Sequence, residues 1–565
     1  MENNQTKEKL LAEIERLKKE LKKKKKYGLV WEDKPEDVVE MCKEKLPVLK
    51  EVKGKEIITD KNKPVNLLIE GDNYHALSVL NYTHKGKIDV IYIDPPYNTG
   101  NKDFKYNDKF VEKEDGFRHS KWLSFIDKRL KLARHLLKDS GILVISIDDN
   151  EVFQLKMLLD KDFGENNFIA CLPTIMNLKG NQDEFAFAGT HEYTLVWAKN
   201  KSKSRFLHFL VNEEDLEDWQ EDEFGFFKQG TLKGGGVNGD RSKRPNLYFP
   251  IFVNKKGNFY TTENDHSLNS NDFVIYPISD GKEMTWRWSK DKLKKEPQNI
   301  LVTKTINGYT LERKIRPQLG DLPTKKPKTI FYKPEYSSGN GTYLLKQIFG
   351  ENRVFNNPKP LELIIDFLKI TLNKDSTVLD FMAGSGTTGH AVLELNKEDS
   401  GKRQFILCTN NENNIATEVC YPRVKNVIEG YKNSKSENVA GLGGNLKYFK
   451  TDFVDYKEST DRNKIKLTKE AVEMLCVKEG TFESVLNNED FKIFKNHNHY
   501  TGIIFEQLAI EDFKKEIKGI KDKISVYIFS LGDDSFEDEF EDIKQKVKLS
   551  PIPEAILKVY RRIYK

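Results

Sequence analysis

The chain has 565 residues, of which 38% are hydrophobic and 32% charged, with a formal net charge of +5. This length exceeds what one core organises, so we expect three or more domains. There is no run of 18 apolar residues and no apolar secretory signal at the N-terminus, so we expect a cytoplasmic protein without a membrane partner. The five cysteines form no CxxC pair, which argues against a zinc site or a disulfide framework.

An N-terminal helix is predicted over residues 5–26, where apolar residues recur at steps of four, three and four: Leu10, Ile14, Leu17 and Leu21. This seam can pack on the body of the protein or against a partner helix, and the sequence leaves both open. We assign residues 1–54 to an N-terminal helical extension.

Residues 55–200 alternate short apolar runs with amphipathic stretches. The runs predict strands over 65–72, 87–94, 141–149 and 192–200, and the amphipathic stretches predict helices over 73–84, 122–138 and 150–163. Continuous apolar strands that alternate with helices are typical of a parallel sheet covered on both faces.

The pattern changes further along the chain. Over residues 201–345 helical periodicity fades while glycine, asparagine, lysine and aromatic residues increase, which predicts an inserted, irregular domain. Residues 346–455 return to the α/β pattern. Residues 456–565 contain a strand-like run at 524–531, an acidic stretch and a basic helical end, and we assign them to a C-terminal assembly domain.

A glycine-rich turn follows the apolar run VLDF and precedes an amphipathic helix. Gly384, Gly386 and Gly389 fit the spacing GxGxxG, which lets a ligand approach the backbone closely at a helix N-terminus. His390 stands where a P-loop needs lysine, which excludes that motif. Three interpretations stay open: a dinucleotide site with Glu412 on the ribose, a nucleoside-type cofactor without a pyrophosphate, and a structural turn.

The stretch VIYIDPPYNTG at 90–100 ends a buried strand in an acid, two prolines and a tyrosine. Ligands of open α/β sheets bind at the carboxyl ends of strands, and prolines there remove N–H donors. Asp94 and a neighbouring carbonyl would form a pair of acceptors for a planar amino group, and Tyr97 offers a stacking face. The stretch therefore indicates a pocket for the exocyclic amine of an aromatic base. A proline-terminated strand with a capping acid is the structural alternative.

Together, the two motifs resemble the amino-group DNA methyltransferases that use S-adenosylmethionine, in which DPPY usually marks adenine N6. DPPY before the glycine loop, with an insert between them, resembles the β-type order of motifs. Further segments resemble the Mod subunit of type III restriction–modification systems: YGLVWEDKPEDV (27–38), LIEGDNYHAL (68–77), RPNLYFPI (244–251), WRW (286–288), FNNPKP (355–360) and the C-terminal PIPEAILKVYRRI.

The resemblance implies an α/β fold of the Rossmann-like S-adenosylmethionine-dependent methyltransferase type, in circularly permuted motif order. The catalytic half with DPPY would be residues 55–200 and the cofactor-binding half residues 346–455. Residues 201–345 would be an inserted target-recognition domain, between helical or α+β terminal extensions.

The resemblance also implies a role for each residue that matches a family motif. The catalytic residues would be Asp94, Pro95, Pro96 and Tyr97, with Asp94 and the Pro95 carbonyl accepting from adenine N6 and Tyr97 stacking on the flipped base. Asp72 would bind the adenine of S-adenosylmethionine, and either Asn411 or Glu412 its ribose. The full cofactor-binding set would be Asp72, Asn73, Asp94, Lys359, Pro360, Asp380, Phe381, Ala383, Gly384, Ser385, Gly386, Thr387, Asn411 and Glu412. No metal is expected, because a sulfonium is already a good electrophile.

Basic side chains among glycine turns in the insert suit contact with duplex DNA. The expected DNA-binding residues are Lys233, Arg241, Lys243, Arg244, Trp286 and Arg287. Trp286 and Trp288 are at strand spacing and share one face, for which core packing and DNA contact stay open.

The likeness further implies a homodimer that associates with a helicase–nuclease Res subunit on bacterial nucleoid DNA. A solitary adenine methyltransferase without a restriction partner is the close alternative. Other classes left open are an NAD-binding oxidoreductase that uses the glycine turn, a non-catalytic DNA-binding subunit, and a methyltransferase acting on RNA or protein.

Overall fold

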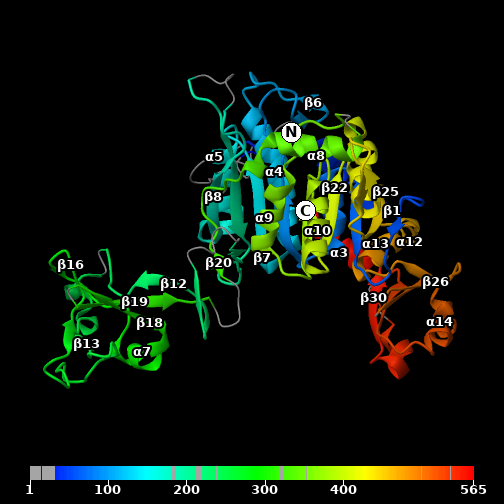
Figure 1. The fold of residues 1–565 in the computed structure, drawn as a ribbon. Coiled ribbons are helices and arrows are strands. Elements are labelled where there is room, and N and C mark those ends of the chain that lie inside the picture. The colour runs from blue at the N-terminus through cyan, green and yellow to red at the C-terminus, as the bar shows by residue number, and fades with distance from the viewer. Residues whose placement is uncertain are drawn as a thin grey trace. The chain divides into compact units, whose positions relative to one another are not determined.

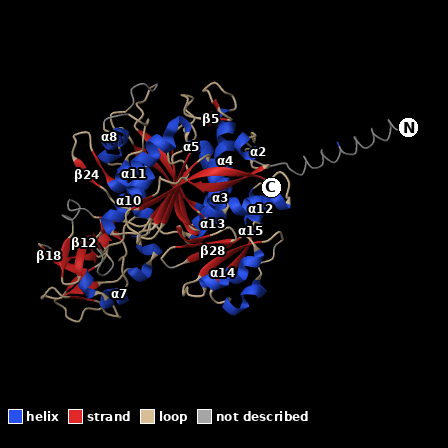
Figure 2. Ribbon diagram, turned by 90° about the vertical axis from the view of Figure 1, so that its right-hand side faces the viewer, coloured by secondary structure: helices blue, strands red, loops and turns tan. Residues whose placement is uncertain are grey.

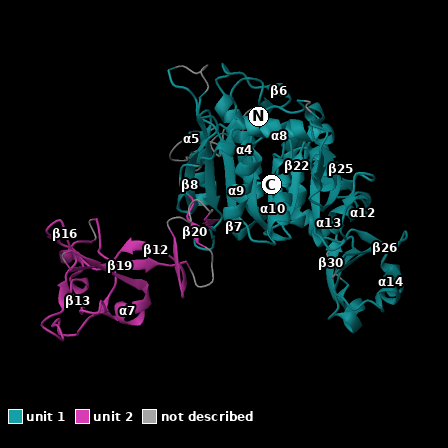
Figure 3. Cartoon of the chain, in the orientation of Figure 1, with its two compact units in different colours: residues 1–207, 328–565 teal, residues 208–327 magenta. Residues whose placement is uncertain are grey.

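The computed structural model describes Ile14 and residues 32–180, 186–211, 219–236, 239–306, 308–317, 323–350, 353–497, 499–532, 534 and 536–564. Apart from Ile14, the helix expected over 5–26 lies outside these residues. The chain divides into two compact units: unit 1 is residues 1–207 with 328–565, and unit 2 is residues 208–327 (Figure 3). Unit 2 begins later and ends earlier than the insert expected at 201–345.

Unit 1 is built around a ten-stranded mixed sheet (Figure 1). The strand order is β1 (Lys45–Glu51), β25 (Asn445–Asp455), β3 (Val65–Glu70), β22 (Gln404–Thr409), β21 (Thr377–Asp380), β4 (Ile88–Ile93), β7 (Leu137–Ile147), β9 (His191–Ala198) and β8 (Phe168–Ile175), with β2 (Ile57–Ile58) paired to β25.

Neighbouring strands from β25 to β7 are parallel. In contrast, β1 is antiparallel to β25, and β9 is antiparallel to both β7 and β8. The parallel sheet predicted from the sequence is therefore confirmed in the centre and wrong at the edges. The reason on one side is that β8 and β9 are consecutive strands that pair directly with each other, without a crossover helix.

Helices cover both faces of the sheet (Figure 2). One face carries α10 (Thr387–Asp399) and α11 (Tyr421–Glu429). The other face carries α3 (Asn73–Thr83), α4 (Arg118–Leu136) and α13 (Val472–Glu479). The same two faces also carry α8 (Ser338–Phe349) and α9 (Leu361–Thr371), which contact α11 and α10, and α5 (Val152–Leu159), which contacts α4. Strands β3 and β4 are almost wholly buried, as continuous apolar runs in a two-faced sheet require.

The C-terminal region carries a five-stranded sheet of β26 (Glu483–Asn487), β27 (Phe491–Lys495), β28 (Tyr500–Ile504), β29 (Ile524–Phe529) and β30 (Val547–Ile552), packed with α14 (Ile510–Ile517). It is preceded by α12 (Asp461–Glu470) and followed by α15 (Glu554–Ile563). The helices α13 and α15 both contact α3, and the Tyr560 hydroxyl donates to the Pro47 carbonyl at 2.5 Å. This part of the chain therefore shares the core of the large sheet.

Unit 2 is a small β-rich unit. One sheet has the order β11 (Gln220–Asp222), β12 (Gly225–Thr231), β19 (Gly308–Ile315) and β18 (Ile300–Thr305), and another β14 (Phe259–Tyr260), β13 (Ile251–Val253) and β15 (Phe273–Ile275). The unit also contains the strand pairs β10 (Phe209–Leu210) with β20 (Thr324–Lys325) and β16 (Ile278–Ser279) with β17 (Lys282–Glu283), and helix α7 (Lys290–Lys295).

The core of unit 2 contains both tryptophans of the WRW segment. Trp286 is 1% exposed, and its Nε1 donates to the Phe249 carbonyl at 2.8 Å, while Trp288 is 8% exposed. The expectation that Trp286 contacts DNA is therefore wrong, because its side chain packs inside the unit. Within the described part of the chain, no helix is long and apolar enough to cross a membrane.

Candidate active site

Two motifs far apart in the sequence meet at the carboxyl edge of the large sheet. Strands β21 and β4 pair in parallel, with Val378 opposite Val90 and Leu379 opposite Ile91. From β21 the chain passes through α10 to β22, which is the neighbour of β21 on one side, whereas β4 is its neighbour on the other side. Such a switch point, where neighbouring strands connect in opposite directions, is where open α/β sheets bind ligands. The DPPY stretch and the glycine turn lie on either side of it.

Asp94 lies just beyond the end of β4, next to a buried lysine. Its Oδ1 is 3.3 Å from Lys359 Nζ, and Lys359 Nζ also lies 2.7 and 2.8 Å from the two carboxylate oxygens of Glu192. Burial raises the pKa of Asp94 to about 6; Lys359 opposes this rise and Glu192 adds to it. One ammonium group thus balances two carboxylates, and its contact with Asp94 is weaker than its contacts with Glu192.

Tyr97 is part of the same network. Its hydroxyl donates to Glu192 Oε2 at 3.0 Å and accepts from Lys359 Nζ at 2.5 Å. Burial, Asp94 and Glu192 hold the pKa of this phenol well above its usual range, so it stays protonated and can donate. The hydroxyl end is thereby fixed while the ring remains only partly buried.

The two proline carbonyls differ in their partners. The Pro96 carbonyl accepts from Trp122 Nε1 at 2.7 Å, which fixes the loop against α4. Among the described residues, none donates to the Pro95 carbonyl. The carbonyl expected to act as an acceptor beside Asp94 therefore has no donor among these residues.

The glycine turn takes backbone conformations that favour glycine. Gly384 has φ +49° and Gly386 φ +80°, and a Cβ at these positions would lie 3.2 Å from the Phe355 ring and 3.1 Å from Cys420 Sγ. Helix α10 starts directly after Gly386. A side chain at either glycine would be strained, so the turn keeps its backbone open at the start of a helix.

The carboxylate of Asp380, just before the turn, forms hydrogen bonds within the protein. Its Oδ1 accepts from the Met382 amide at 3.0 Å and its Oδ2 from Thr388 Oγ1 at 2.6 Å. Burial raises the pKa of Asp380 to about 7. Phe381, 0% exposed, is also turned inward. Both expected cofactor-binding side chains shape the turn, and they do not face an open pocket.

A buried arginine that the sequence did not reveal supports the turn from α11. Arg423, 1% exposed, donates through Nη1 to Ser385 Oγ at 3.0 Å and to Thr387 Oγ1 at 2.8 Å. The hydroxyl groups of both residues, expected to bind the cofactor, therefore brace the loop. Ala383 is likewise buried, and Pro360 caps α9 directly after Lys359.

The neighbouring strand ends carry the other expected cofactor residues. Asp72 follows β3 and caps α3, with Oδ1 accepting from the Tyr74 amide at 2.7 Å. Past β22, Asn411 Oδ1 accepts from both the amide and the hydroxyl of Thr417 at 3.1 Å. The Glu412 carboxylate is 40% exposed and pairs with Lys105. Of the two residues expected at the ribose, Glu412 has the more available side chain.

In unit 2 the expected DNA-binding residues have different surroundings. Arg241 pairs with Glu283 at 2.7 Å, and Lys233 Nζ donates to the Ile278 carbonyl at 2.8 Å. Arg287 Nε donates to the Lys233 carbonyl at 2.9 Å. Lys243 and Arg244 are exposed, and among the described residues neither charged group forms a hydrogen bond or an ion pair. Of this group these two are the most available for phosphate contact.

Sequence reasoning missed Glu192, which lies in the segment HEYTLVWA. Its only signal is a charged residue at the start of an otherwise apolar strand, and nothing local links it to Lys359 or Asp94. It also missed Glu151, which accepts from Asn98 Nδ2 at 2.6 Å just after DPPY.

Comparison with known proteins identifies the family. The family model described as DNA methylase matches residues 88–419, which is more than half of the chain. The EcoPI type III Mod subunit of Escherichia phage P1 is 44% identical over 69% of this chain and 66% of its own length. The type II methyltransferase M.KpnI of Klebsiella pneumoniae is 33% identical over 68% of this chain and 90% of its own.

The StyLTI type III Mod subunit of Salmonella typhimurium is 32% identical over 64% of this chain and 55% of its own length. The match thus leaves a third or more of both Mod subunits uncovered. The family model, by contrast, spans the DPPY stretch, unit 2 and the glycine turn in one match. The chain belongs to the DNA methylase family.

Proposed function

We propose that this chain transfers a methyl group from S-adenosylmethionine to N6 of an adenine flipped out of duplex DNA, as the Mod subunit of a type III restriction–modification system. One observation carries the proposal. The Asp94 carboxylate and the Pro95 carbonyl, to which no described residue donates, are adjacent acceptors at the sheet edge, beside the glycine turn. Two acceptors match the two hydrogens of an aromatic amine.

The residues at this edge fit S-adenosylmethionine by their chemistry. The open backbone at Gly384 and Gly386 admits a close ligand, and Asp72 and Glu412 supply carboxylates for an amino group and for ribose hydroxyls. Acidic groups also suit a cationic ligand. When bound, S-adenosylmethionine supplies an electrophilic methyl group.

Asp94 and the Pro95 carbonyl orient the amine and stabilise the positive charge that develops on its nitrogen. Correct placement of reacting groups can contribute about 7–11 kcal/mol in well-oriented systems. The partly buried ring of Tyr97 stacks on the flipped base, at ~1–3 kcal/mol, which offsets part of the few kcal/mol that flipping costs.

Lys359 must not neutralise Asp94, because a carboxylate closed onto an ammonium group is a poorer acceptor for the base. Glu192 prevents this by taking two short contacts to Lys359, against one longer contact to Asp94. Glu192 also balances the ammonium charge near a cationic methyl donor. We therefore assign Glu192 a positioning role in the reaction.

Unit 2 acts as the target-recognition part, with Lys243 and Arg244 on the DNA phosphates. The Mod relatives are named as subunits of restriction–modification enzymes, which supports a Res partner and a dimeric assembly for this chain.

The test is to express the chain alone in a bacterial host that lacks DNA methylation and to map modified bases by long-read sequencing. N6-methyladenine at one short asymmetric site, on one strand, is the expected result. Modification of cytosine N4, or no modification by a folded protein that binds S-adenosylmethionine, would contradict the proposal. An Asp94→Ala chain expressed in parallel is the control for background methylation.

A solitary methyltransferase is the second candidate. It is favoured by the match to the type II enzyme M.KpnI, which covers 90% of that protein, more than of either Mod subunit. Methylation of both strands of a palindrome in the same experiment would select this candidate. The oxidoreductase and non-catalytic alternatives do not explain the DPPY stretch, and membership of the DNA methylase family argues against both.

A further inference from the structure

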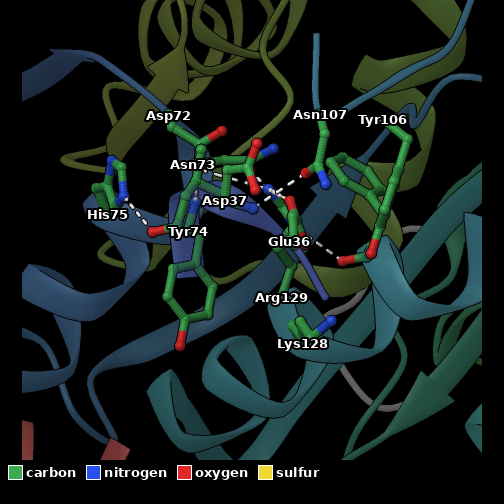
Figure 4. Close-up of polar contacts among 12 residues, drawn as sticks. Glu36, Asp37, Asp72, Asn73, Tyr74, His75, Tyr106, Asn107, Lys128 and Arg129 are labelled. Carbon is green, nitrogen blue, oxygen red and sulfur yellow. Dashed lines mark hydrogen bonds and ion pairs between the residues drawn. The ribbon is translucent and has the colours of Figure 1, made fainter. Parts of the chain in front are cut away.

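A buried arginine connects the N-terminal segment to the cofactor edge of the sheet (Figure 4). Arg129 on α4 is 0% exposed, and its two terminal nitrogens donate to the two carboxylate oxygens of Glu36 at 3.0 and 2.7 Å. Its Nε donates to Asn73 Oδ1, and its guanidinium lies 3.8 Å above the Phe125 ring. Glu36 is therefore the counterion of a cation that is out of contact with water.

Asp72 lies at the margin of this cluster. Arg129 Nη2 reaches Asp72 Oδ1 only at 3.4 Å, and that oxygen already accepts from the Tyr74 amide at 2.7 Å. Within the described residues, none donates to Asp72 Oδ2. The free oxygen is at the end of β3, on the edge that carries the glycine turn.

The segment that carries Glu36 is held by contacts other than its ion pair. The Tyr106 hydroxyl donates to the carbonyls of Lys34 and Pro35 at 2.7 and 3.0 Å, and Lys128 Nζ donates to the Lys34 carbonyl at 2.7 Å. Figure 4 shows Glu36, Asp72 and Arg129 in one cluster, in which Arg129 Nη2 lies 2.7 Å from Glu36 Oε1 and 3.4 Å from Asp72 Oδ1. The two acids therefore compete for one guanidinium.

We propose that Glu36 is a positioning residue for the cofactor: it holds Arg129 in a two-pronged pair and so leaves Asp72 free to accept from the amino group of the cofactor's adenine. This inference rests on the proposed function, because it takes Asp72 to face S-adenosylmethionine. Arginine prefers two parallel bonds to one carboxylate, so without Glu36 the guanidinium would turn to Asp72. Glu36 then belongs to the cofactor site, although it precedes the family match.

The experiment measures S-adenosylmethionine binding to the full chain by titration calorimetry, together with methyl-transfer kinetics. Glu36→Gln keeps the size of the side chain and removes its charge. We expect the Kd for S-adenosylmethionine to rise about tenfold, as for loss of one good hydrogen bond, while kcat at saturating cofactor stays within about twofold. The matched control is Asp37→Asn, one residue away and exposed, which should bind as the wild type does.

A second variant tests the cause. In Glu36→Gln with Arg129→Gln the freed cation is gone, so binding should recover to within about threefold of the wild type. Equal binding by Glu36→Gln and the wild type, or no recovery in the double variant, would overturn the proposal. If Glu36→Gln does not fold in a thermal melt, Glu36→Asp is measured instead and should weaken binding about threefold.

The outcomes for this inference and for the proposed function differ. A wild-type chain that neither binds S-adenosylmethionine nor methylates DNA would overturn both. A wild-type chain that does both, while Glu36→Gln binds the cofactor equally well, would overturn the role of Glu36 alone.

Discussion

Asp94 has an unusual place for an acceptor, because its side chain is only partly buried and makes one long contact, 3.3 Å, with the ammonium group of Lys359. Asp94→Asn retains the size of the side chain but turns one acceptor oxygen into a donor. We expect methyl transfer to fall by about 10²–10³-fold, as for other groups that stabilise transition-state charge. S-adenosylmethionine binding, measured by titration calorimetry, should change by less than about threefold. A variant that kept more than about a tenth of the wild-type rate would show that Asp94 does not orient the amine.

Glu192 influences the pH dependence of the reaction, because its charge shifts the pKa of Asp94. In the proposed reaction Asp94 must be ionised to accept from the base, so the rate should fall as pH drops through about 6. The charge of Glu192 raises the pKa of Asp94, and Lys359 lowers it. Glu192→Gln therefore shifts the acidic limb of the kcat profile to lower pH. It also lowers the plateau about tenfold, because Lys359 closes onto Asp94.

The measurement for Glu192 is single-turnover methyl transfer between pH 5 and pH 8. An acidic limb at the same pH in the variant and the wild type would contradict the role given to Glu192. Glu418→Gln, at an exposed helical site outside this network, is a control that should leave the profile unchanged.

At the residue scale, the sequence predicted the chemistry of the DPPY stretch because four neighbouring residues carry it. Glu192, Arg423 and Arg129 could not be found this way. Each is a single charged residue in an ordinary strand or helix, and its partner comes from a distant segment. Phe381 shows a different limit: its motif was found, but the burial of its side chain depends on packing that the motif does not encode.

At the scale of elements, a buried carboxyl group joins α4 to the loop after DPPY. Glu151 has a fully buried side chain and accepts from Asn98 Nδ2 at 2.6 Å, with His119 Nδ1 2.7 Å from the same oxygen. Burial raises its pKa to about 8; Asn98 and Arg118 oppose this rise, and Asp148 adds to it. The folded protein therefore favours the protonated acid more strongly than the unfolded chain does.

The sign of the effect on stability follows from that pKa. The contribution of protonated Glu151 is complete below about pH 4.5 and is lost as pH rises through about 8, to a limit of about 5 kcal/mol. Glu151→Gln has no such loss. Between pH 5 and pH 9 the Tm of the wild type, measured by calorimetry, should therefore fall relative to that of the variant. Parallel Tm curves for the two proteins would rule out an ionisation at Glu151.

Element positions were largely predictable, whereas their pairing was not. The helix expected over 122–138 is α4 at 118–136, and the strand expected over 87–94 is β4 at 88–93. Apolar periodicity is local, so it reveals such elements directly. Strand direction is not local: β9 reads as one more buried strand but runs antiparallel, because its partner β8 is the strand just before it.

At the scale of the whole molecule, unit 2 is one continuous segment of the chain, between the two segments that form unit 1. Strand β10 pairs with β20, so the segments that enter and leave unit 2 run side by side, with Phe209 opposite Lys325. Replacing residues 208–327 by a short glycine–serine linker should leave S-adenosylmethionine binding within about threefold of the wild type. Site-specific methylation should be lost in the sequencing assay, because the proposed phosphate and base contacts are removed with the unit.

The deletion is checked by a thermal melt and by the same titration. If the shortened chain still methylates one defined site, target recognition lies elsewhere in the protein. At this scale the sequence predicted an insert from composition alone. It placed the borders too widely, because residues 328–345 have loop-like composition but pack with unit 1.

The strand order also has a consequence for biosynthesis. Strand β4 ends at residue 93, but its neighbour β21 starts at residue 377, and both neighbours of β3 come still later in the chain. At about 5–20 residues per second, a ribosome needs roughly 15–60 s to make the stretch between β4 and β21. For that time β3 has no strand to pair with, and one edge of β4 is open to other chains. The edge that holds Asp94 and the glycine turn is therefore among the last parts of the protein to form, and a nascent chain depends on protection of these two strands until then.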